Sequence, residues 1–316
     1  MKSIVLAIAA LAAATAAAGA QSYPSKPVRV ITANSAGGTS DIFVRALGDE
    51  LQKVWGQPVV IENRSGGGMN IAGRGCAEAP NDGYTICILP GETLVLNQFT
   101  FKSIPYDPLK DFQPITNLFI NTQVMVVSSK LGANSLDELA KLSKEKPLAY
   151  SALAIPMQIM MDRWKAASGA DIVFVPSRGG GEIVTGLMTG TAPVAIVGLP
   201  NFIPHIQNGT VKALAVDGDK RSHLFPSVPT FGEIGQPVFA PVYFGFVAPA
   251  GIAPDVVQKI YRDVKKIGDD PAFRQKRLLD IGIEPVFNSP EEFDRYIKAQ
   301  RVSAEKSIKE SGFQPR

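Results

Sequence analysis

A short run of small and polar residues near the start of the chain has the composition of an anion-binding turn. It reads Ser35-Ala36-Gly37-Gly38-Thr39-Ser40-Asp41 and lies between an expected strand, Val28–Thr32, and an expected helix, Ser40–Trp55. Glycines tolerate the positive φ angles that turn backbone N–H groups inward, so both are expected to help line a concave turn. The helix adds free N–H donors and a partial positive charge at its first turn. The sequence therefore predicts a socket for a small anion such as a carboxylate.

Other polar candidates follow later strands. Glu92 and Thr93 come after the strand that ends near Leu89, and Arg178 follows the strand that ends near Pro176. Arg178 either pairs with a carboxylate in a bidentate manner or is a solvated charge at a turn. Because an ionised Glu92 would repel a bound carboxylate, we expect it to bond a hydroxyl group or to point to solvent, and we keep Thr93 as the ligand-binding candidate.

The motifs of common enzymes are missing from the sequence. Neither a phosphate-binding Gly-x-x-x-x-Gly-Lys loop nor a Gly-x-Gly-x-x-Gly after a strand occurs, and there is no Gly-x-Ser-x-Gly elbow. The two histidines, His205 and His223, belong to no metal-ligand pattern, and no pair of carboxylates stands out. We therefore expect no catalytic residues, no metal and no cofactor.

The first 20 residues have the composition of a secretory signal peptide. Lys2 is the only charge, an apolar run follows, and Ala18-Gly19-Ala20 fits the small-residue cleavage pattern before Gln21. The alternative is an uncleaved N-terminal anchor. Cleavage would leave about 296 of the 316 residues, enough for two domains. The formal net charge of +3 would fall to about +2, and without a basic cluster this argues against a nucleic-acid partner.

Strands and helices alternate in two series, which predicts an α/β fold with two lobes. Around 237–249 the chain becomes aromatic and Pro-rich, as suits a segment that crosses back between lobes. We expect lobe 1 to hold 21–122 and 237–316, and lobe 2 to hold 123–236. The expected strands are Val28–Thr32, Val59–Glu62 and Thr85–Leu89, then Gln123–Ser128, Leu148–Ala152, Ile172–Pro176, Val194–Val197 and Ala213–Val216. The expected helices include Ser40–Trp55, Asn70–Glu78, Leu136–Lys144, Gln158–Ser168, Glu182–Thr189 and one opened by the capping box Ser289-Pro290-Glu291-Glu292.

The two cysteines, Cys76 and Cys87, lie on an expected helix and on the next strand. An oxidising compartment would permit a disulfide between them. Their apolar neighbours Ala77, Ile86 and Ile88 favour two buried thiols instead, and we take this second interpretation as the expectation.

Seven motifs occur in order along essentially the whole mature chain. They are Tyr23-Pro24-Ser25-Lys26-Pro27, Gly37-Gly38-x-x-Asp41, Glu62-Asn63-Arg64, Ala79-Pro80-Asn81-Asp82-Gly83-Tyr84-Thr85, Pro105-Tyr106-Asp107-Pro108-Leu109-Lys110-Asp111-Phe112, Ser227-Val228-Pro229-Thr230 and Val247-Ala248-Pro249-Ala250-Gly251. With them the chain resembles one family, the Bug (TctC-type) extracytoplasmic solute receptors of tripartite tricarboxylate transport systems. The resemblance implies a two-lobed periplasmic binding protein of the type II-like, Venus-flytrap kind, with a hinge between the lobes. It also implies a monomer that closes on a small carboxylate-bearing solute and passes it to membrane permease components.

The chain departs from this family on the side of the second lobe. The loop that is usually rich in Gly, Ser and Asn reads Ser151-Ala152-Leu153-Ala154-Ile155-Pro156-Met157. A frequent Asp falls on Val197, which Gly198 follows, and a frequent Tyr-Lys pair is replaced by Ser177-Arg178. A carboxylate buried among apolar groups lacks partners. We therefore expect a ligand with one carboxylate in the first-lobe socket and an apolar or aromatic body toward Leu153, Met157 and Val197; the alternative is that these side chains only pack within the lobe.

The ligand-binding residues expected from these arguments are Ser35, Ala36, Gly37, Gly38, Thr39, Ser40, Asp41, Thr93, Ser151, Ala152, Leu153, Met157, Arg178, Val197 and Gly198. The expected function is a periplasmic, non-enzymatic solute receptor. Two alternatives stay open: a ligand sensor for a signalling partner, and an enzyme of carboxylic acids on the same scaffold. An enzyme would need an acid–base pair in the cleft, and Val197 in place of Asp argues against one.

Overall fold

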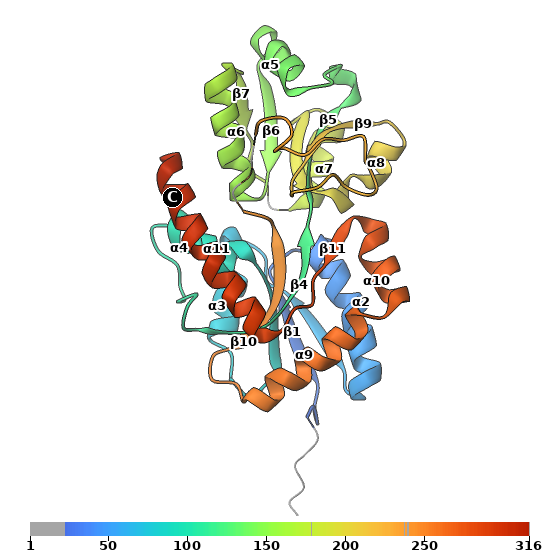
Figure 1. Cartoon of the computed structure of the whole chain (residues 1–316), viewed down its shortest axis with the longest axis vertical. Helices are drawn as coiled ribbons and strands as arrows, with labels where there is room; N and C mark the ends of the chain where they lie inside the picture. Colours follow the sequence, from blue (N-terminus) through green and yellow to red (C-terminus); the bar gives the residue numbers. More distant parts are fainter. Residues whose placement is uncertain (1–22, 178, 237, 239, 316) are drawn as a thin grey trace, which may run out of the picture.

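The chain folds into two lobes, which lie one above the other in Figure 1. The computed structural model describes residues 23–177, 179–236, 238 and 240–315. The predicted signal peptide, 1–20, and the candidate ligand residue Arg178 lie outside these described residues. The α/β class and the two-lobed architecture are confirmed, whereas the residues chosen as domain boundaries stay a prediction.

The first lobe is assembled from both ends of the chain. Its sheet has six strands in the order β11-β4-β10-β3-β1-β2, and β1 is parallel to both β2 and β3. The elements of this lobe are β1 (Val28–Thr32), α2 (Thr39–Trp55), β2 (Val59–Asn63), η1 (Gly67–Met69), α3 (Asn70–Ala77), β3 (Thr85–Pro90), η2 (Glu92–Leu96), α4 (Asn97–Thr100), β4 (Phe112–Asn121), β10 (Tyr243–Pro249), α9 (Pro254–Gly268), α10 (Pro271–Arg277), β11 (Ile283–Pro285) and α11 (Pro290–Ser311).

The second lobe is formed by the middle of the chain. Its sheet has five strands in the order β7-β6-β8-β5-β9, and β6 is parallel to its neighbours β7 and β8. The elements are β5 (Gln123–Ser128), α5 (Leu136–Glu145), β6 (Leu148–Ala152), α6 (Ile155–Ser168), β7 (Ile172–Phe174), α7 (Gly180–Thr189), β8 (Val194–Gly198), η4 (Leu199–Asn201), α8 (Ile203–Gln207) and β9 (Val211–Val216).

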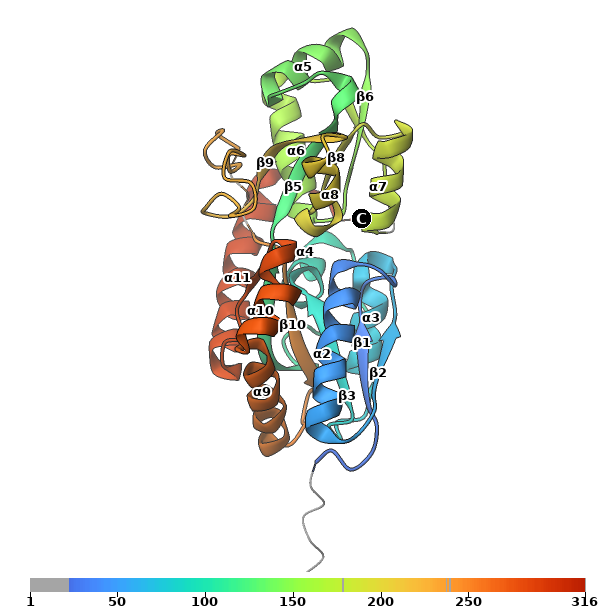
Figure 2. The ribbon, with the colours of Figure 1, turned by 90° about the vertical axis from the view of Figure 1, so that its right-hand side faces the viewer.

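Two segments of the chain connect the lobes. β4 of the first lobe runs into β5 of the second with only Thr122 between them, and the chain returns from β9 toward β10. Figure 2 shows these crossings on the side that carries α11. Ile155 and Ile159 of α6 share one buried cluster with Ile297 of α11, so the last helix also packs near the second lobe. Such paired crossings suit a hinge.

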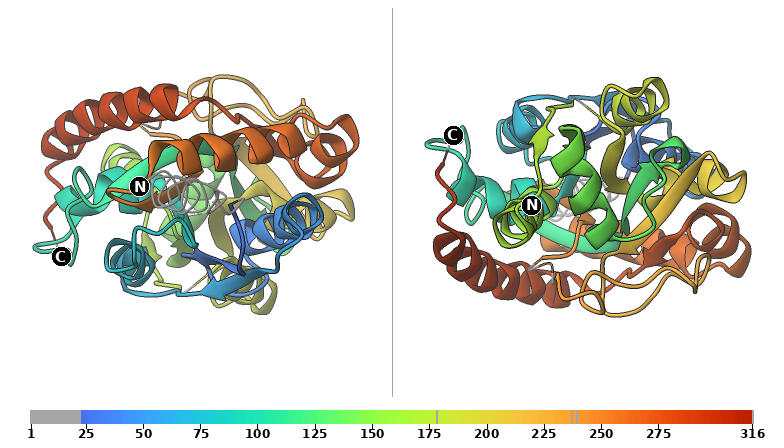
Figure 3. Two further views of the ribbon diagram at one scale, coloured as in Figure 1. Left: turned by 90° about the horizontal axis from the view of Figure 1, so that it is seen from below. Right: turned by 90° about the horizontal axis from the view of Figure 1, so that it is seen from above.

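Each sheet is covered by helices whose buried faces follow from the sequence pattern. On α2 the residues Phe43, Leu47 and Leu51 recur at every fourth position and are at most 1% exposed. Gly56 ends this helix with φ +64°, a left-handed conformation that favours glycine. The expected capping box of α11 is present, with Ser289 and Glu292 each accepting from the other's backbone N–H. Figure 3 shows the helices outside the sheets in both lobes.

Three expectations about local structure need correction. The first is the cysteine pair: Cys76 and Cys87 form a disulfide, with their Cα atoms 6.1 Å apart. α3 crosses β3, which brings the two side chains together inside an apolar cluster, so burial and bonding occur at once. The second is the start of α6, which lies at Ile155 rather than near 158. The third is the strand set of the first lobe, because the sequence analysis did not predict β4, β10 or β11.

Within the part of the chain that the structure describes, no helix is long and apolar enough to cross a membrane. The same residues contain no group of three or more His, Cys, Asp or Glu side chains that could hold a metal ion.

Candidate functional site

The turn between β1 and α2 has the predicted place but not the predicted donors. Gly37 adopts φ +81°, whereas Gly38 has φ −73° and needs no glycine for its backbone conformation. The N–H of Gly37 donates to Asp41 Oδ2 over 2.9 Å, and the N–H of Gly38 donates to the carbonyl of Ser35 over 3.1 Å. Both glycine N–H groups are therefore used within the turn, and neither is left for a ligand.

The donors that remain belong to the first turn of α2. Thr39 and Ser40 are the first two residues of α2, so their N–H groups have no carbonyl acceptor in a preceding helical turn. The partial positive charge of the helix end lies at the same place. Gly38 and Thr39 line a cavity between the lobes, while the Ser40 hydroxyl is buried and shares a 3.1 Å hydrogen bond with Thr32. The anion socket is thus a helix end held by a glycine turn.

Asp41 is the anchor of this turn and does not line the cavity. Its carboxylate accepts from Gly37 N–H, from Asn63 Nδ2 over 2.8 Å, and from Arg45 over 2.9 and 3.1 Å. Burial by itself would raise the pKa of Asp41, but the hydrogen bonds from Arg45, Gly37 and Asn63 outweigh it and hold the pKa below its usual value. Asn63 also donates to the carbonyl of Asn34, so β1 and the turn are fixed together.

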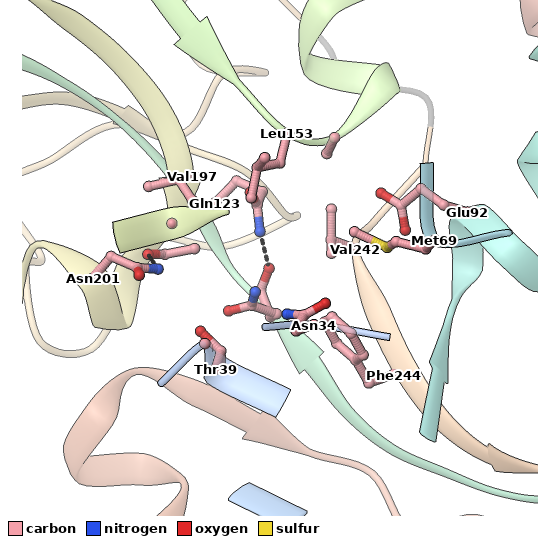
Figure 4. A pocket seen from close by; sticks show the side chains of 15 residues that line it. Asn34, Thr39, Met69, Glu92, Gln123, Leu153, Val197, Asn201, Val242 and Phe244 are labelled. Atoms are coloured by element: carbon pink, nitrogen blue, oxygen red, sulfur yellow. Dashed lines mark hydrogen bonds between the residues drawn. The ribbon is translucent and has the colours of Figure 1, made fainter. Parts of the chain in front are cut away.

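The cavity between the lobes is small and mixed in polarity. Its volume is about 40 Å³, room for a few water molecules. Figure 4 shows Thr39 and Asn34 on the side of the first lobe, with Leu153 and Val197 across from them. Among the described residues, those that line it are Asn34, Gly38, Thr39, Met69, Glu92, Asn121, Gln123, Leu153, Ala154, Gly180, Val197, Gly198, Asn201, Val242 and Phe244.

The two lobes touch around this cavity. A Cβ atom placed on Gly179 of the second lobe would lie 3.0 Å from Ser35 Oγ of the first. A Cβ atom on Gly198 would lie 2.6 Å from Asn121 Nδ2, so this glycine permits close approach of β8 to the end of β4. A benzene ring occupies an apolar cavity of roughly 150 Å³, several times larger than this one. An aromatic ligand body therefore requires the lobes to part.

The hinge contributes polar groups to the cavity. Gln123 donates from Nε2 to the carbonyl of Asn121 over 2.8 Å, and both residues line the cavity. The backbone N–H of Gln123 donates to Asp217 Oδ1 over 2.6 Å. Burial raises the pKa of Asp217 to about 7. A buried carboxyl group at the end of β9 thus fixes the first residue of the second lobe.

Only part of the second-lobe prediction reaches the cavity. Leu153, Val197 and Gly198 line it. Met157 is fully buried in the core because α6 begins early, and Ala152 is buried beside it. Ser151 is also buried, and its hydroxyl donates to the carbonyl of Val175 over 2.9 Å. Met157, Ala152 and Ser151 are not among the described lining residues, which contradicts their expected place at the ligand.

In the loop after β3, Thr93 is not among the described lining residues; of the two alternatives for Glu92, the solvent-facing one is wrong and a hydroxyl partner stays a prediction. Thr93 is fully buried and faces α3, where a Cβ atom on Gly73 would lie 2.7 Å from its methyl group. Glu92 does not point to solvent: it is 6% exposed and lines the cavity. Of the first turn, Ser35, Ala36 and Gly37 are exposed at its rim. For Gly38, Thr39, Leu153, Val197 and Gly198, contact with a ligand stays a prediction.

Several lining residues were absent from the sequence prediction. Val242 and Phe244 belong to the segment that returns to the first lobe and contains β10. No local sequence pattern shows between which two strands of the sheet that segment inserts. Met69 follows the triple glycine and has φ +71°, which turns it toward the cavity. Asn34 directly precedes the predicted turn, and its position after an apolar strand was a usable signal.

A sheet in each lobe, two crossings and a cavity between the lobes define a periplasmic binding protein. The chain belongs to the tripartite tricarboxylate transporter receptor family, whose model matches residues 43–313. It is 31% identical over 288 residues to the protein BugT of Bordetella pertussis, covering 88% of this chain and 87% of that protein. It is also 31% identical over 311 residues to a protein encoded in the gbd 5' region of Cupriavidus necator, covering 96% and 94%.

Solved structures of similar proteins match the fold of this protein over almost the whole chain. Rpa4515 of R. palustris, solved with adipate, has 29% sequence identity and a TM-score of 0.86, covering 93% of this chain and 100% of that one. The periplasmic binding protein BugD has 26% identity and a TM-score of 0.84, with coverage of 93% and 100%. MatC from Rhodopseudomonas palustris, with bound malate, has 25% identity and a TM-score of 0.81, with coverage of 90% and 100%.

Proposed function

We propose that this protein is a periplasmic receptor for a small solute with one carboxylate and an apolar body. Family membership and relatives solved with adipate and malate support a carboxylate ligand. The observation that carries the finer proposal is the asymmetry of the cavity. The first lobe supplies a helix N-terminus at Thr39, and the second supplies the apolar side chains of Leu153, Ala154 and Val197. The amides of Gln123 and Asn201 also line the cavity from the second lobe, but each already donates to a backbone carbonyl.

The binding cycle follows from the hinge. An open form admits the solute, whose carboxylate meets the first-turn N–H groups of α2. Closure brings Leu153 and Val197 onto the apolar body and expels water from it. The solute shifts the lobes toward the closed form only by its differential affinity for that form. We propose that the closed receptor acts as a monomer and is recognised by the membrane permease of a tripartite transporter. We also propose that it catalyses no reaction.

The site of action follows from the N-terminus. We propose that 1–20 direct export and are removed before Gln21, which leaves the receptor in the periplasm. The family of receptors to which the chain belongs supports this location. N-terminal sequencing of the protein from the periplasmic and membrane fractions tests this proposal. A chain that begins at Met1 and is found in the membrane fraction would refute cleavage.

Calorimetric titration tests the ligand class. The mature protein is titrated with hexanoate and benzoate, which have one carboxylate, and with citrate, malate and adipate, which have more. We expect the monocarboxylates to bind and to lose affinity in a Leu153→Asp variant. Tight binding of citrate with no response to either monocarboxylate would refute the proposal. Native mass spectrometry of the receptor from the periplasm identifies any solute that it carries.

A further inference from the structure

A second cavity lies on the other face of the hinge from the cavity between the lobes. Successive side chains of an extended chain point to opposite faces. Where β4 runs into β5, Asn121 and Gln123 line the cavity between the lobes, whereas Ile120 and Thr122 line the second cavity. Figure 2 shows α11, whose Tyr296 lines the second cavity, on the opposite side of the molecule from α7, which contributes to the first. We call the second cavity the hinge cavity.

The hinge cavity has the size and the walls of a small-molecule site. Its volume is about 600 Å³, and pockets that hold small molecules measure roughly 300–1,000 Å³. Both lobes contribute to it: Asp217 and Phe231 follow β9 of the second lobe, whereas Glu284 lies on β11 and Tyr296 on α11 of the first. Ile120 and Phe231 give it apolar surface. A molecule with an apolar body therefore fits there as the lobes stand.

The charged groups of the hinge cavity are mostly carboxyl groups. Asp217, Asp219 and Glu284 line it, and Lys220 is the one cationic side chain among its described lining residues. The phenol of Tyr296 is the remaining titratable group in that set. Within the part of the chain that the structure describes, the side chains of Asp219, Glu284 and Lys220 make no ion pair and no hydrogen bond. Lys220 therefore does not neutralise the carboxyl groups by direct contact.

Asp217 is the buried member of this group and lacks a partner for one oxygen. It is 4% exposed, its Oδ1 accepts from the backbone N–H of Gln123 over 2.6 Å, and its Oδ2 has no hydrogen-bond partner among the described residues. Burial raises the pKa of Asp217 to about 7, and the charge of Glu284 adds to the rise. The two carboxyl groups thus come from different lobes and repel each other. A positive charge in the hinge cavity would offset this repulsion.

We propose that the hinge cavity binds a small organic ammonium ion that carries an apolar body. The positive charge of the ion offsets the repulsion between Asp217 and Glu284, and the apolar body is taken out of water by the walls that include Ile120 and Phe231. No covalent bond is made or broken. Where Asp217 is protonated in the free protein, binding releases its proton to solvent. This site is separate from the carboxylate site proposed above and does not depend on it.

The test is calorimetric titration of the mature protein with benzylamine, which is a cation with an apolar ring, at pH 6, 7 and 8. No carboxylate solute is present. Because Asp217, with a pKa of about 7, contributes its charge only when ionised, Kd should fall about tenfold from pH 6 to pH 8. Benzyl alcohol has the same shape without the charge, so it should bind about tenfold more weakly than benzylamine at pH 8.

Three variants locate the site. Asp217→Asn keeps an acceptor oxygen for the Gln123 N–H but no charge, so it should weaken benzylamine binding at pH 8 about tenfold and abolish the pH dependence. Glu284→Gln changes an exposed side chain and should weaken binding about fivefold. Asp49→Asn, an exposed position on α2, is the control and should behave like the wild type.

Four outcomes overturn the inference. They are no binding of benzylamine at millimolar concentration, equal affinity for benzyl alcohol, the same Kd at pH 6 and pH 8, and unaltered binding in both Asp217→Asn and Glu284→Gln. The last would place benzylamine at another site. Urea unfolding checks that each variant is folded; if Asp217→Asn is not, Glu284→Gln decides, because its side chain is exposed. Failure of hexanoate or benzoate to bind would refute the proposed receptor function and leave this result unchanged.

Discussion

The predicted anion socket depends on the carboxylate of Asp41, which is not among the described lining residues of the cavity. In the Asp41→Ala variant, Gly37 N–H and Asn63 Nδ2 lose their common acceptor, and Arg45 loses its ion-pair partner. The turn that presents the first-turn N–H groups of α2 then keeps the hydrogen bond from Gly38 N–H to Ser35 and the one from Asn63 to the carbonyl of Asn34. We therefore expect both the stability and the ligand affinity to fall.

The size of the effect follows from the partners of Asp41. Hydrogen bonds to a charged group contribute about 1.5–3 kcal/mol each, so the two from Gly37 and Asn63 amount to about 3–6 kcal/mol. Arg45 is 49% exposed, and its ion pair adds at most about 1 kcal/mol. Against a typical stability of about 5–15 kcal/mol, the variant stays folded. Because the pKa of Asp41 is lowered in the folded protein, this stabilisation is present above its usual value of 3.8 and is lost as pH falls through the lower folded value.

The assay is urea unfolding at pH 7, followed by titration with hexanoate. Asp41→Ala should lose about 3–6 kcal/mol and bind at least tenfold more weakly, and Asp41→Asn, which keeps one acceptor oxygen, should lose about half as much. Asp49→Asn, an exposed position on the same helix, is the control and should change neither quantity. A loss below about 1 kcal/mol with unaltered affinity would refute the view that Asp41 organises the socket.

Three further variants test other parts of the structure. Replacing Cys76 and Cys87 by alanine should lower the free energy of unfolding by about 3 kcal/mol, because the disulfide closes a loop with a sequence separation of 11. Urea unfolding of the wild type with and without reductant, and of the variant, checks this. Equal unfolding midpoints would contradict it. Gly38→Leu should weaken hexanoate binding at least tenfold while the protein stays folded: Gly38 has an ordinary φ, and the closest atom to an added Cβ is the carbonyl oxygen of Ser35 at 3.2 Å. Unaltered affinity would remove Gly38 from the site. The pKa of Asp217 is raised to about 7 in the folded protein, so its contribution to stability is present below pH 4 and is lost as pH rises through 7. Asp217→Asn should therefore remove up to about 4 kcal/mol of the decline in unfolding free energy between pH 4 and 8. Parallel pH profiles of the variant and the wild type in unfolding experiments would argue against this role.

The sequence allowed the socket to be located but not its donors to be assigned. A strand, a glycine pair and a helix start are local features, and they placed the turn correctly. Which N–H groups remain free depends on where Asp41 and the carbonyl of Ser35 lie after folding. Composition alone made both glycines look like ligand contacts, whereas Gly37 serves the turn and Gly38 lines the cavity.

The errors in the second lobe have a traceable cause. Pro156 marks the first turn of α6, and Pro is common at that position, so the helix start at Ile155 was readable from the sequence. With the helix in place, Met157 turns into the core while Leu153, just before the helix, stays at the cavity. Val242, Phe244 and Gln123 could not be placed in this way, because they reach the site through pairing between segments far apart in the chain.

The proposed ligand preference rests on the apolar side chains of the second lobe, because the amide donors of Gln123 and Asn201 are already bonded to backbone carbonyls. A second carboxylate on the solute would be pressed against Leu153 and Val197, where neither side chain can donate a hydrogen bond. Leaving a polar group unpaired in such surroundings costs about 1–3 kcal/mol by protein mutational data, and a full charge costs more. Since about 1.4 kcal/mol is tenfold in affinity, this alone disfavours a dicarboxylate by one to two orders of magnitude relative to a methyl group at the same place. We therefore expect the first lobe to recognise the carboxylate and the second lobe to select among acids when the hinge closes.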